Sequence, residues 1–128
     1  MATWVPTIHR LEPARDATPL TDVMPLLERM VESYGQVTVA GLLGVDRSTV
    51  SLWVRGKRRI GNDLGARILD VHAVLSRAHR VYNPALAARW LMGHDPRLGG
   101  ARPIDVVATG GASAVIDALD EIEAGAYA

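Results

Sequence analysis

The stretch from Gln36 to Arg59, QVTVAGLLGVDRSTVSLWVRGKRR, decides the fold of this chain of 128 residues. Its apolar side chains recur where two short helices that cross at a steep angle must touch; they are Val39, Leu42, Leu43, Val45, Val50 and Trp53. Ala40 is small enough for the two helices to approach closely, and Gly44 permits the positive φ that ends the first helix. Asp46 or Ser48 stands where a side-chain oxygen can cap the second helix. The pattern predicts a helix-turn-helix followed by a basic run.

The second helix of this motif has two different faces. Val50 and Trp53 are three residues apart and point inward. The outward face can hydrogen-bond to bases and contact a thymine methyl group, as a recognition helix in the major groove does. The candidate DNA-binding residues on this helix are Arg47, Ser48, Thr49, Ser51, Leu52 and Arg55. The spacing predicts contact with double-stranded operator DNA.

A basic run follows directly, in which Arg55, Lys57, Arg58 and Arg59 place four cations within five residues. These side chains can bind phosphates on either side of the groove. The alternative is a cluster of solvated charges at a helix C-terminus, where the helix dipole favours cations. Joined to the helix-turn-helix spacing, the basic run favours DNA binding.

The composition indicates the class of protein. Apolar residues make up 48% of the chain and charged residues 22%, which is typical of globular proteins and sufficient for one domain or two small ones. Cysteine is absent, which excludes disulfides and thiolate metal sites and favours a reducing cytoplasm. The start of the chain lacks a secretion signal, and no apolar run reaches the length of a membrane span. We therefore expect a cytoplasmic protein without a membrane partner.

The charges are unevenly distributed although the formal net charge is zero. Residues 46–60 hold five basic residues and one acid, whereas residues 117–123 hold four acids and no base. Net neutrality argues against a general polyanion binder, and the asymmetry predicts different partners for the two parts of the chain.

Three segments are expected. Residues 1–19 contain three prolines and no periodic pattern, so they predict a flexible arm. A loosely held leader is one interpretation of this arm, and insertion of Arg10 or Arg15 into a DNA minor groove is the other. Residues 20–82 are expected to form the helix-turn-helix domain with a long connecting helix, and residues 83–128 a small helical C-terminal lobe. The predicted fold class is all-α.

Two further helices complete the predicted helix-turn-helix domain. Thr21 or Asp22 can cap a leading helix that has Pro25 in its first turn and ends at Gly35. The long connecting helix is expected from Asp63 to about residue 81. Its apolar side chains recur at helical spacing and are expected to be buried; they are Leu64, Ile68, Val71 and Leu75.

The C-terminal lobe is predicted to contain three short helices, over residues 84–92, 104–108 and 113–125, with Ser113 as the cap of the last one. The side chains expected in its core are Leu86, Trp90, Leu91, Leu98, Val115, Ile116, Leu119 and Ile122. Asp95 and Pro96 open a turn. Glycines permit the other tight turns of the lobe; they are Gly99, Gly100, Gly110 and Gly111.

The sequence offers no catalytic, metal or cofactor site. His72 and His79 are seven residues apart, about two helical turns, whereas a metal-binding pair needs about one, so we interpret them as core-edge or solvated histidines. The glycines at 99–100 and 109–111 lack the spacing and the preceding strand of a phosphate-binding loop. Asp105 is more simply a first-turn acid favoured by the helix dipole than a catalytic base. We expect neither an enzyme nor a cofactor.

Two parts of the chain resemble known families. The helix-turn-helix is similar to that of the Xre, or phage-repressor-like, family. The C-terminal part resembles the toxin-binding domain of the Xre/MbcA/ParS antitoxins. The residues that carry this likeness, in the order expected of the family, are Trp90, Leu91, Leu98, Gly99, Gly100, Pro103, Asp105, Gly110, Gly111, Val115, Leu119, Ile122 and Gly125. Together the two resemblances cover about residues 25–128.

The resemblance implies a bacterial antitoxin of a type II system. Its partner would be a RES-domain toxin that destroys NAD; the C-terminal portion would block this toxin, and the N-terminal portion would repress the operon. In this mechanism the last helix and the tail at residues 124–128 cover the substrate cleft of the toxin. Asp120, Glu121 and Glu123 then contact basic residues of the toxin that otherwise hold NAD phosphates. A solvated helix face is the alternative for these acids. The expected toxin-binding residues are Trp90, Leu98, Asp120, Glu121, Glu123, Ala124, Gly125 and Tyr127.

A different class of function stays open beside the antitoxin. A stand-alone repressor would use the same helix-turn-helix, and its C-terminal lobe would serve only for dimerisation. Either protein would read a two-fold operator as a homodimer, with recognition helices about 34 Å apart or a multiple of that distance. For the antitoxin, the homodimer would lie within a toxin–antitoxin hetero-oligomer.

Overall fold

The computed structural model describes residues 22–126, which are helical and contain no strand. Its elements are α2 (Met24–Tyr34), α3 (Gln36–Leu43), α4 (Arg47–Val54), α5 (Asn62–Ala78), α6 (Pro84–Met92), the 3-10 turn η2 (Pro96–Leu98), α7 (Pro103–Gly110) and α8 (Ser113–Ala126). The predicted all-α fold is confirmed. The predictions for the arm at 1–19, for Thr21 and for residues 127–128 lie outside the described residues. Among the helices described, none combines the length and the apolar character that crossing a membrane requires.

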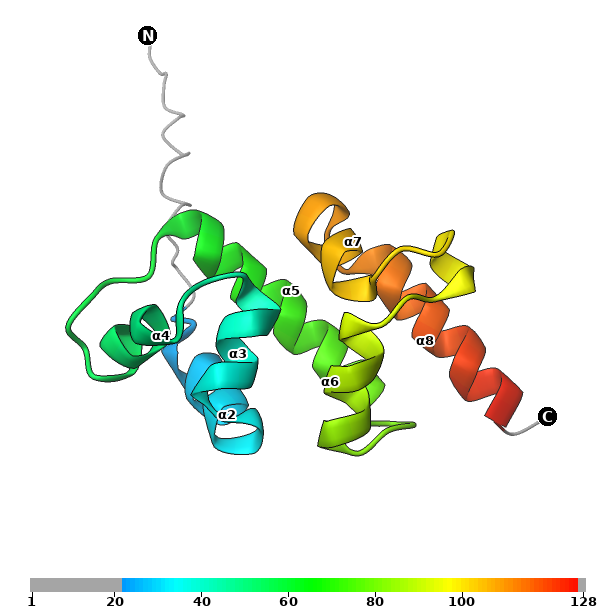
Figure 1. Ribbon diagram of the computed structural model, residues 1–128, viewed down its shortest axis with the longest axis horizontal. Helices are drawn as coiled ribbons and strands as arrows, with labels where there is room; N and C mark the ends of the chain where they lie inside the picture. The colour runs from blue at the N-terminus through cyan, green and yellow to red at the C-terminus, as the bar shows by residue number, and fades with distance from the viewer. Residues whose placement is uncertain (1–21, 127–128) are drawn as a thin grey trace, which may run out of the picture.

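The helix α5 runs through the middle of the molecule (Figure 1). It packs against α2 and α3 of the first half of the chain and against α7 and α8 of the second half. Its buried side chains are Ile68, Val71, Val74, Leu75 and Ala78. The predicted apolar stripe of this helix is confirmed, although Leu64 at its start is only half-buried. Both halves of the chain therefore share one core along α5.

The predicted helix-turn-helix consists of α3, the turn at Gly44 and α4. Val39 and Leu43 of α3 and Val50 of α4 are fully buried, and Trp53 is 2% exposed. Gly44 has a φ of 71°, and the Val45 N–H donates to the Ala40 carbonyl at 3.0 Å across it. This 6→1 hydrogen bond is the mark of a Schellman motif, which needs the left-handed residue that Gly44 supplies.

The end of α4 repeats this motif, which the sequence analysis did not anticipate. Gly56 has a φ of 71°, and its N–H donates to the Trp53 carbonyl at 3.0 Å. The Lys57 N–H donates to the Leu52 carbonyl at 2.8 Å. These are the two hydrogen bonds of a Schellman motif, so α4 is limited to eight residues and the basic run leaves it as a loop.

Capping differs from the predictions. Asp46 occupies the N-cap position of α4, but its side chain makes no cap hydrogen bond, and Ser48 lies inside the helix. The backbone carbonyl of Asp46 instead accepts from the Thr49 N–H at 3.0 Å. Ser113 is the first residue of α8, so the position before the helix belongs to Ala112. Asp22 precedes α2 and accepts from the Met24 N–H at 2.9 Å.

Some boundaries and one core position were predicted wrongly. The helix α5 ends at Ala78, three residues before the predicted end, because the chain turns there to enter α6. The helix α6 spans residues 84–92 as predicted, but Leu86 is 44% exposed. Ala87 and Leu91, four residues apart and fully buried, define the inward face of α6, and Leu86 lies off that face.

The glycine that separates α3 from α4 can be tested against a glycine inside α3. Gly44→Ala is expected to lower the free energy of unfolding by about 1–2 kcal/mol, since alanine resists the left-handed conformation. Gly41→Ala is expected to raise it by about 0.5–1 kcal/mol, because Gly41 is helical and a Cβ there would meet no atom within 4 Å. Urea denaturation measures both. Changes of the same sign in the two variants would contradict this account of the turn.

Candidate functional site

The outward face of α4 is the first candidate site. Arg47, Ser48 and Arg55 are exposed, whereas Thr49, Ser51 and Leu52 are half-buried. Inward-facing Val50 and Trp53 fix this orientation because both are buried. The six residues predicted to contact DNA therefore share one outward-facing side of the two-turn helix and its C-cap.

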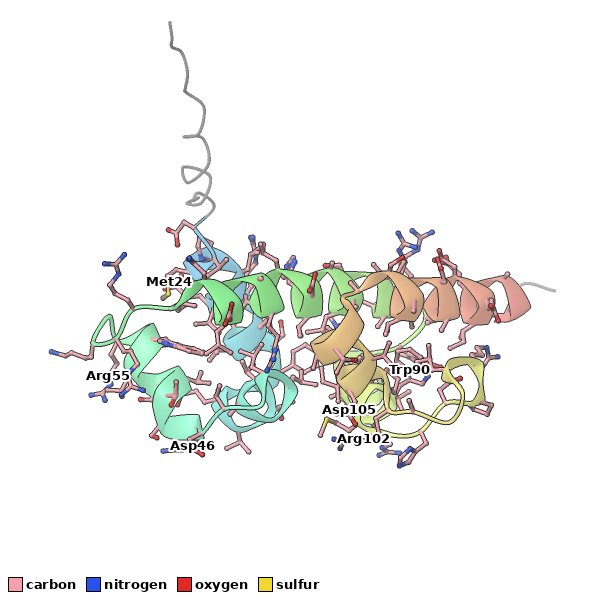
Figure 2. The ribbon with its side chains drawn as sticks, turned by 90° about the horizontal axis from the view of Figure 1, so that it is seen from above. Met24, Asp46, Arg55, Trp90, Arg102 and Asp105 are labelled. Carbon is pink, nitrogen blue, oxygen red and sulfur yellow. The ribbon has the colours of Figure 1, made fainter. Side chains whose placement is uncertain are left out.

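The basic loop, defined as residues 55–60, continues this surface. Its cations Arg55, Lys57, Arg58 and Arg59 are all exposed. Within the part of the chain that the structure describes, none of the four forms an ion pair. Figure 2 places Arg55 at one end of the molecule, with Trp90, Arg102 and Asp105 in the other half. The positive charge is therefore unneutralised and concentrated at the helix-turn-helix end.

A groove of about 440 Å³ runs between the basic loop and the start of α2. Its lining residues are Asp22, Val23, Met24, Trp53, Gly56, Lys57, Arg58, Arg59 and Ile60. Its cations come from the basic loop, and the α2 side contributes the apolar Val23 and Met24 together with the acid Asp22.

The C-terminal lobe is built around a buried carboxylate. Asp95 is 5% exposed; its Oδ2 accepts from the Trp90 indole N–H at 2.8 Å, and its Oδ1 accepts from the Arg97 backbone N–H at 2.7 Å. Its backbone also closes the loop, since the Asp95 carbonyl accepts from the Gly100 N–H at 3.0 Å and the Asp95 N–H donates to the Ala101 carbonyl at 3.1 Å. Asp95 therefore fixes α6, η2 and the glycine turn relative to one another.

Sequence reasoning gave Asp95 only the role of opening a turn. The signal that could have shown more is the Asp-Pro step, where an aspartate side chain accepts from a backbone N–H two residues on. A tryptophan five residues earlier adds a donor that needs a partner when it is buried.

Trp90 and Leu98, both predicted to bind toxin, pack within the lobe. Trp90 is half-buried, and its ring lies 6.3 Å from that of Tyr82, measured between centroids. Leu98 is half-buried and packs on the core. Their partly exposed surfaces lie at the edge of the core.

Each acid predicted to bind toxin pairs with an arginine of this chain. Asp120 pairs with Arg77, and a carboxylate oxygen of Glu123 lies 3.1 Å from Arg80 Nε. Glu121 lies 3.8 Å from Arg97 Nε. These pairs join α8 to the end of α5 and to η2. Ala124 and Gly125 are exposed at the end of α8, and Tyr127 lies outside the described residues.

Asp105 lies in the first turn of α7, as predicted, and pairs with Arg102. The pair is bidentate, with distances of 2.9 and 3.0 Å. The hydrogen bond from Arg102 holds the pKa of Asp105 below its usual value. In residues 22–126 no group of three or more histidine, aspartate or glutamate side chains is arranged to hold a metal ion.

The role of the buried carboxylate can be tested with Asp95→Asn. An amide NH₂ must then face either the indole N–H or the Arg97 N–H, so one donor loses its acceptor. We expect the free energy of unfolding to fall by about 1–3 kcal/mol. Asp117→Asn, at an exposed position of α8, is the matched control and should have little effect. Equal free energies of unfolding for the two variants in chemical denaturation would contradict the structural role assigned to Asp95.

Comparison with known proteins shows what the C-terminal half of the chain is similar to. Residues 77–125 match the family described as antitoxin Xre/MbcA/ParS C-terminal toxin-binding domain. A chain in the crystal structure of the M. tuberculosis MbcT–MbcA toxin–antitoxin complex has a similar fold, with a TM-score of 0.65 and 18% sequence identity over 82% of this chain and 96% of that chain. The comparison with curated proteins gave no significant match. The resemblance predicted from the sequence is confirmed for residues 77–125, which are similar to the C-terminal toxin-binding domain of the Xre/MbcA/ParS antitoxins.

Proposed function

We propose that this protein is the antitoxin of a type II toxin–antitoxin system, that it neutralises a RES-domain toxin that degrades NAD, and that it represses its own operon. The observation that carries the proposal is the match of residues 77–125 to an antitoxin toxin-binding domain. The helix-turn-helix and the cations of the basic loop, which form no ion pair with residues 22–126, support the DNA-binding part. The inhibitory and repressing roles require no catalytic group of this chain.

The position of the two surfaces supports a protein with two partners. The outward face of α4 and the basic loop lie at one end of the molecule, and the lobe around Trp90 occupies the other half (Figure 2). Because α5 packs against helices of both halves, one chain can hold a toxin and DNA at once. A homodimer would present two recognition helices to the two halves of an operator. The boundary between the domains, at residues 82 and 83, remains part of the proposal.

The ion pairs of α8 indicate which of its carboxylates are most available to the toxin. A carboxylate has about four lone-pair sites and can accept from a second cation while it keeps its first partner. The side chain of Glu121 is 69% exposed and its arginine is 3.8 Å away, whereas that of Glu123 is 20% exposed. We therefore propose that Glu121 makes the main contact with basic groups of the toxin. Asp120 makes a secondary contact, and the main role of Glu123 is to hold α8 on α5.

The toxin-binding role of α8 can be tested in the complex with the toxin that copurifies from the native host. Glu121→Lys reverses a charge that faces the partner, so we expect affinity for the toxin to fall at least about tenfold. Asp117→Lys makes the same change one turn earlier and should cost much less. Deletion of residues 123–128 should release toxicity on co-expression while operator binding is kept. Full protection by the truncated protein would contradict the covering mechanism, and absence of any copurifying toxin would favour the stand-alone repressor.

The DNA-binding role of α4 and the basic loop is tested separately. Arg47→Ala and Arg55→Ala are each expected to weaken binding to the promoter DNA of the operon by about 1–3 kcal/mol if the side chain reads a base. Lys57→Ala should reduce the salt dependence of binding by about one unit, because one phosphate contact is lost. Arg89→Ala, at an exposed position of α6, is the control. Gel-shift titrations at several salt concentrations measure all four variants, and unchanged affinity in the first two would refute the groove assignment.

A further inference from the structure

A second cavity, of about 170 Å³, lies between α2 and the second half of α5, and none of its lining residues belongs to either proposed surface. Its lining residues are Arg29, Met30, Ser33, Tyr34, His72, Leu75, Ser76 and His79. Met30 and Leu75 are buried and form an apolar floor. The other six side chains are polar: three come from α2, two from α5 and one, His79, from the C-cap of α5. Spacings of four between Arg29 and Ser33 and between His72 and Ser76 bring these pairs onto one face of each helix.

All the polar side chains of this cavity can donate a hydrogen bond, and no carboxylate lines it. Arg29 offers a guanidinium, Ser33 and Ser76 offer hydroxyls, and His72 offers a ring N–H. Among residues 22–126, Arg29 forms no ion pair. The cavity therefore gathers donors and positive charge without an acceptor of matching charge.

The pKa shifts of His72 and Tyr34 agree with this geometry. Burial lowers the pKa of His72, and the positive charges of Arg29 and His79 lower it further. Burial raises the pKa of Tyr34, so the phenol remains neutral and adds no negative charge. From α2 the titratable or charged groups that face His72 are Arg29 and Tyr34, and from α5 itself His79. The other helices packed on α5 contribute no residue to the lining.

We infer that this cavity binds a tetrahedral oxyanion, either inorganic phosphate or the phosphoryl group of a small phosphate monoester. Arg29 supplies the charge, and the hydroxyl and imidazole donors surround the oxygens. The volume accommodates a phosphoryl group with a short organic substituent. The inference goes beyond the proposed function, because neither the toxin nor the operator contacts are assigned to these residues.

The Tyr34 hydroxyl and His79 Nε2 are hydrogen-bonded, and the two rings stack with centroids 5.8 Å apart. The imidazole of His72 links the site to pH. A bound anion favours the imidazolium form of His72, so binding takes up protons. Affinity therefore rises as the pH falls toward the pKa of His72, which burial holds below its ordinary value.

Calorimetric titration of the full chain tests the site, with chloride at matched ionic strength as the blank. Inorganic phosphate should bind saturably, and Arg29→Gln should weaken binding at least about tenfold. Arg89→Gln removes an equally exposed arginine outside the cavity and should bind as the wild type does. Glycerol 3-phosphate serves as the second probe: tighter binding than phosphate identifies a monoester ligand, and equal or weaker binding identifies the free anion.

Sulfate provides the pH test because it stays dianionic from pH 5 to 8. Its affinity should increase as the pH falls, and His72→Gln should reduce that dependence while the protein remains folded. Non-saturating binding, equal loss in the two arginine variants, or loss only when the basic loop is neutralised would overturn the inference. An unchanged pH dependence in His72→Gln would overturn the role given to that imidazole.

Discussion

The structure depends on the burial of one helix from two sides. The α5 side chains Ile68, Val71, Val74 and Leu75 are at most 2% exposed, and they pack against the helix-turn-helix bundle as well as the C-terminal lobe. Complete burial of one aliphatic side chain of this size contributes about 1.5–3 kcal/mol. Neither half can leave α5 without exposing this stripe. The two candidate surfaces are therefore held in a fixed relation, although they lie in different halves of the molecule.

Polar contacts determine which charged side chains at the surface stay accessible to a partner. Gly44 and Gly56 end α3 and α4 through backbone hydrogen bonds, so α4 stays short and its cations continue into a loop. In the other half, Asp95 orients the turn through two donors, and arginines hold α8 in place. Exposed ion pairs contribute little to stability, about 0–1 kcal/mol each. Their effect here is to determine which carboxylate oxygens remain accessible to a partner.

Local sequence patterns were enough to predict the helices and the helix-turn-helix, because apolar spacing and left-handed glycines act within a few residues of the chain. The bounds of α6 follow from Asn83 and Pro84, where the Asn83 side chain caps the helix at 2.9 Å. The pairing of α8 with arginines depends on contacts between residues 43 apart, as for Arg77 and Asp120, and no local pattern encodes it. Leu86 was misplaced for the same reason, since hydrophobicity alone does not choose between the faces of α6.

The last turn of α5 and the residues just after it connect the parts of the molecule. Arg77 and Arg80 face α8, whereas His79 faces Tyr34 of α2. One short segment thus touches α2, which leads the helix-turn-helix bundle, and α8, the helix that we propose contacts the toxin. Because the main packing partners of α8 are α5, α7 and η2 rather than α4, a toxin held on the exposed side of α8 need not displace α4. This arrangement is consistent with the proposed simultaneous binding of toxin and operator. An effect of toxin binding on operator binding would have to act through residues 77–80 or through contacts between chains of the oligomer.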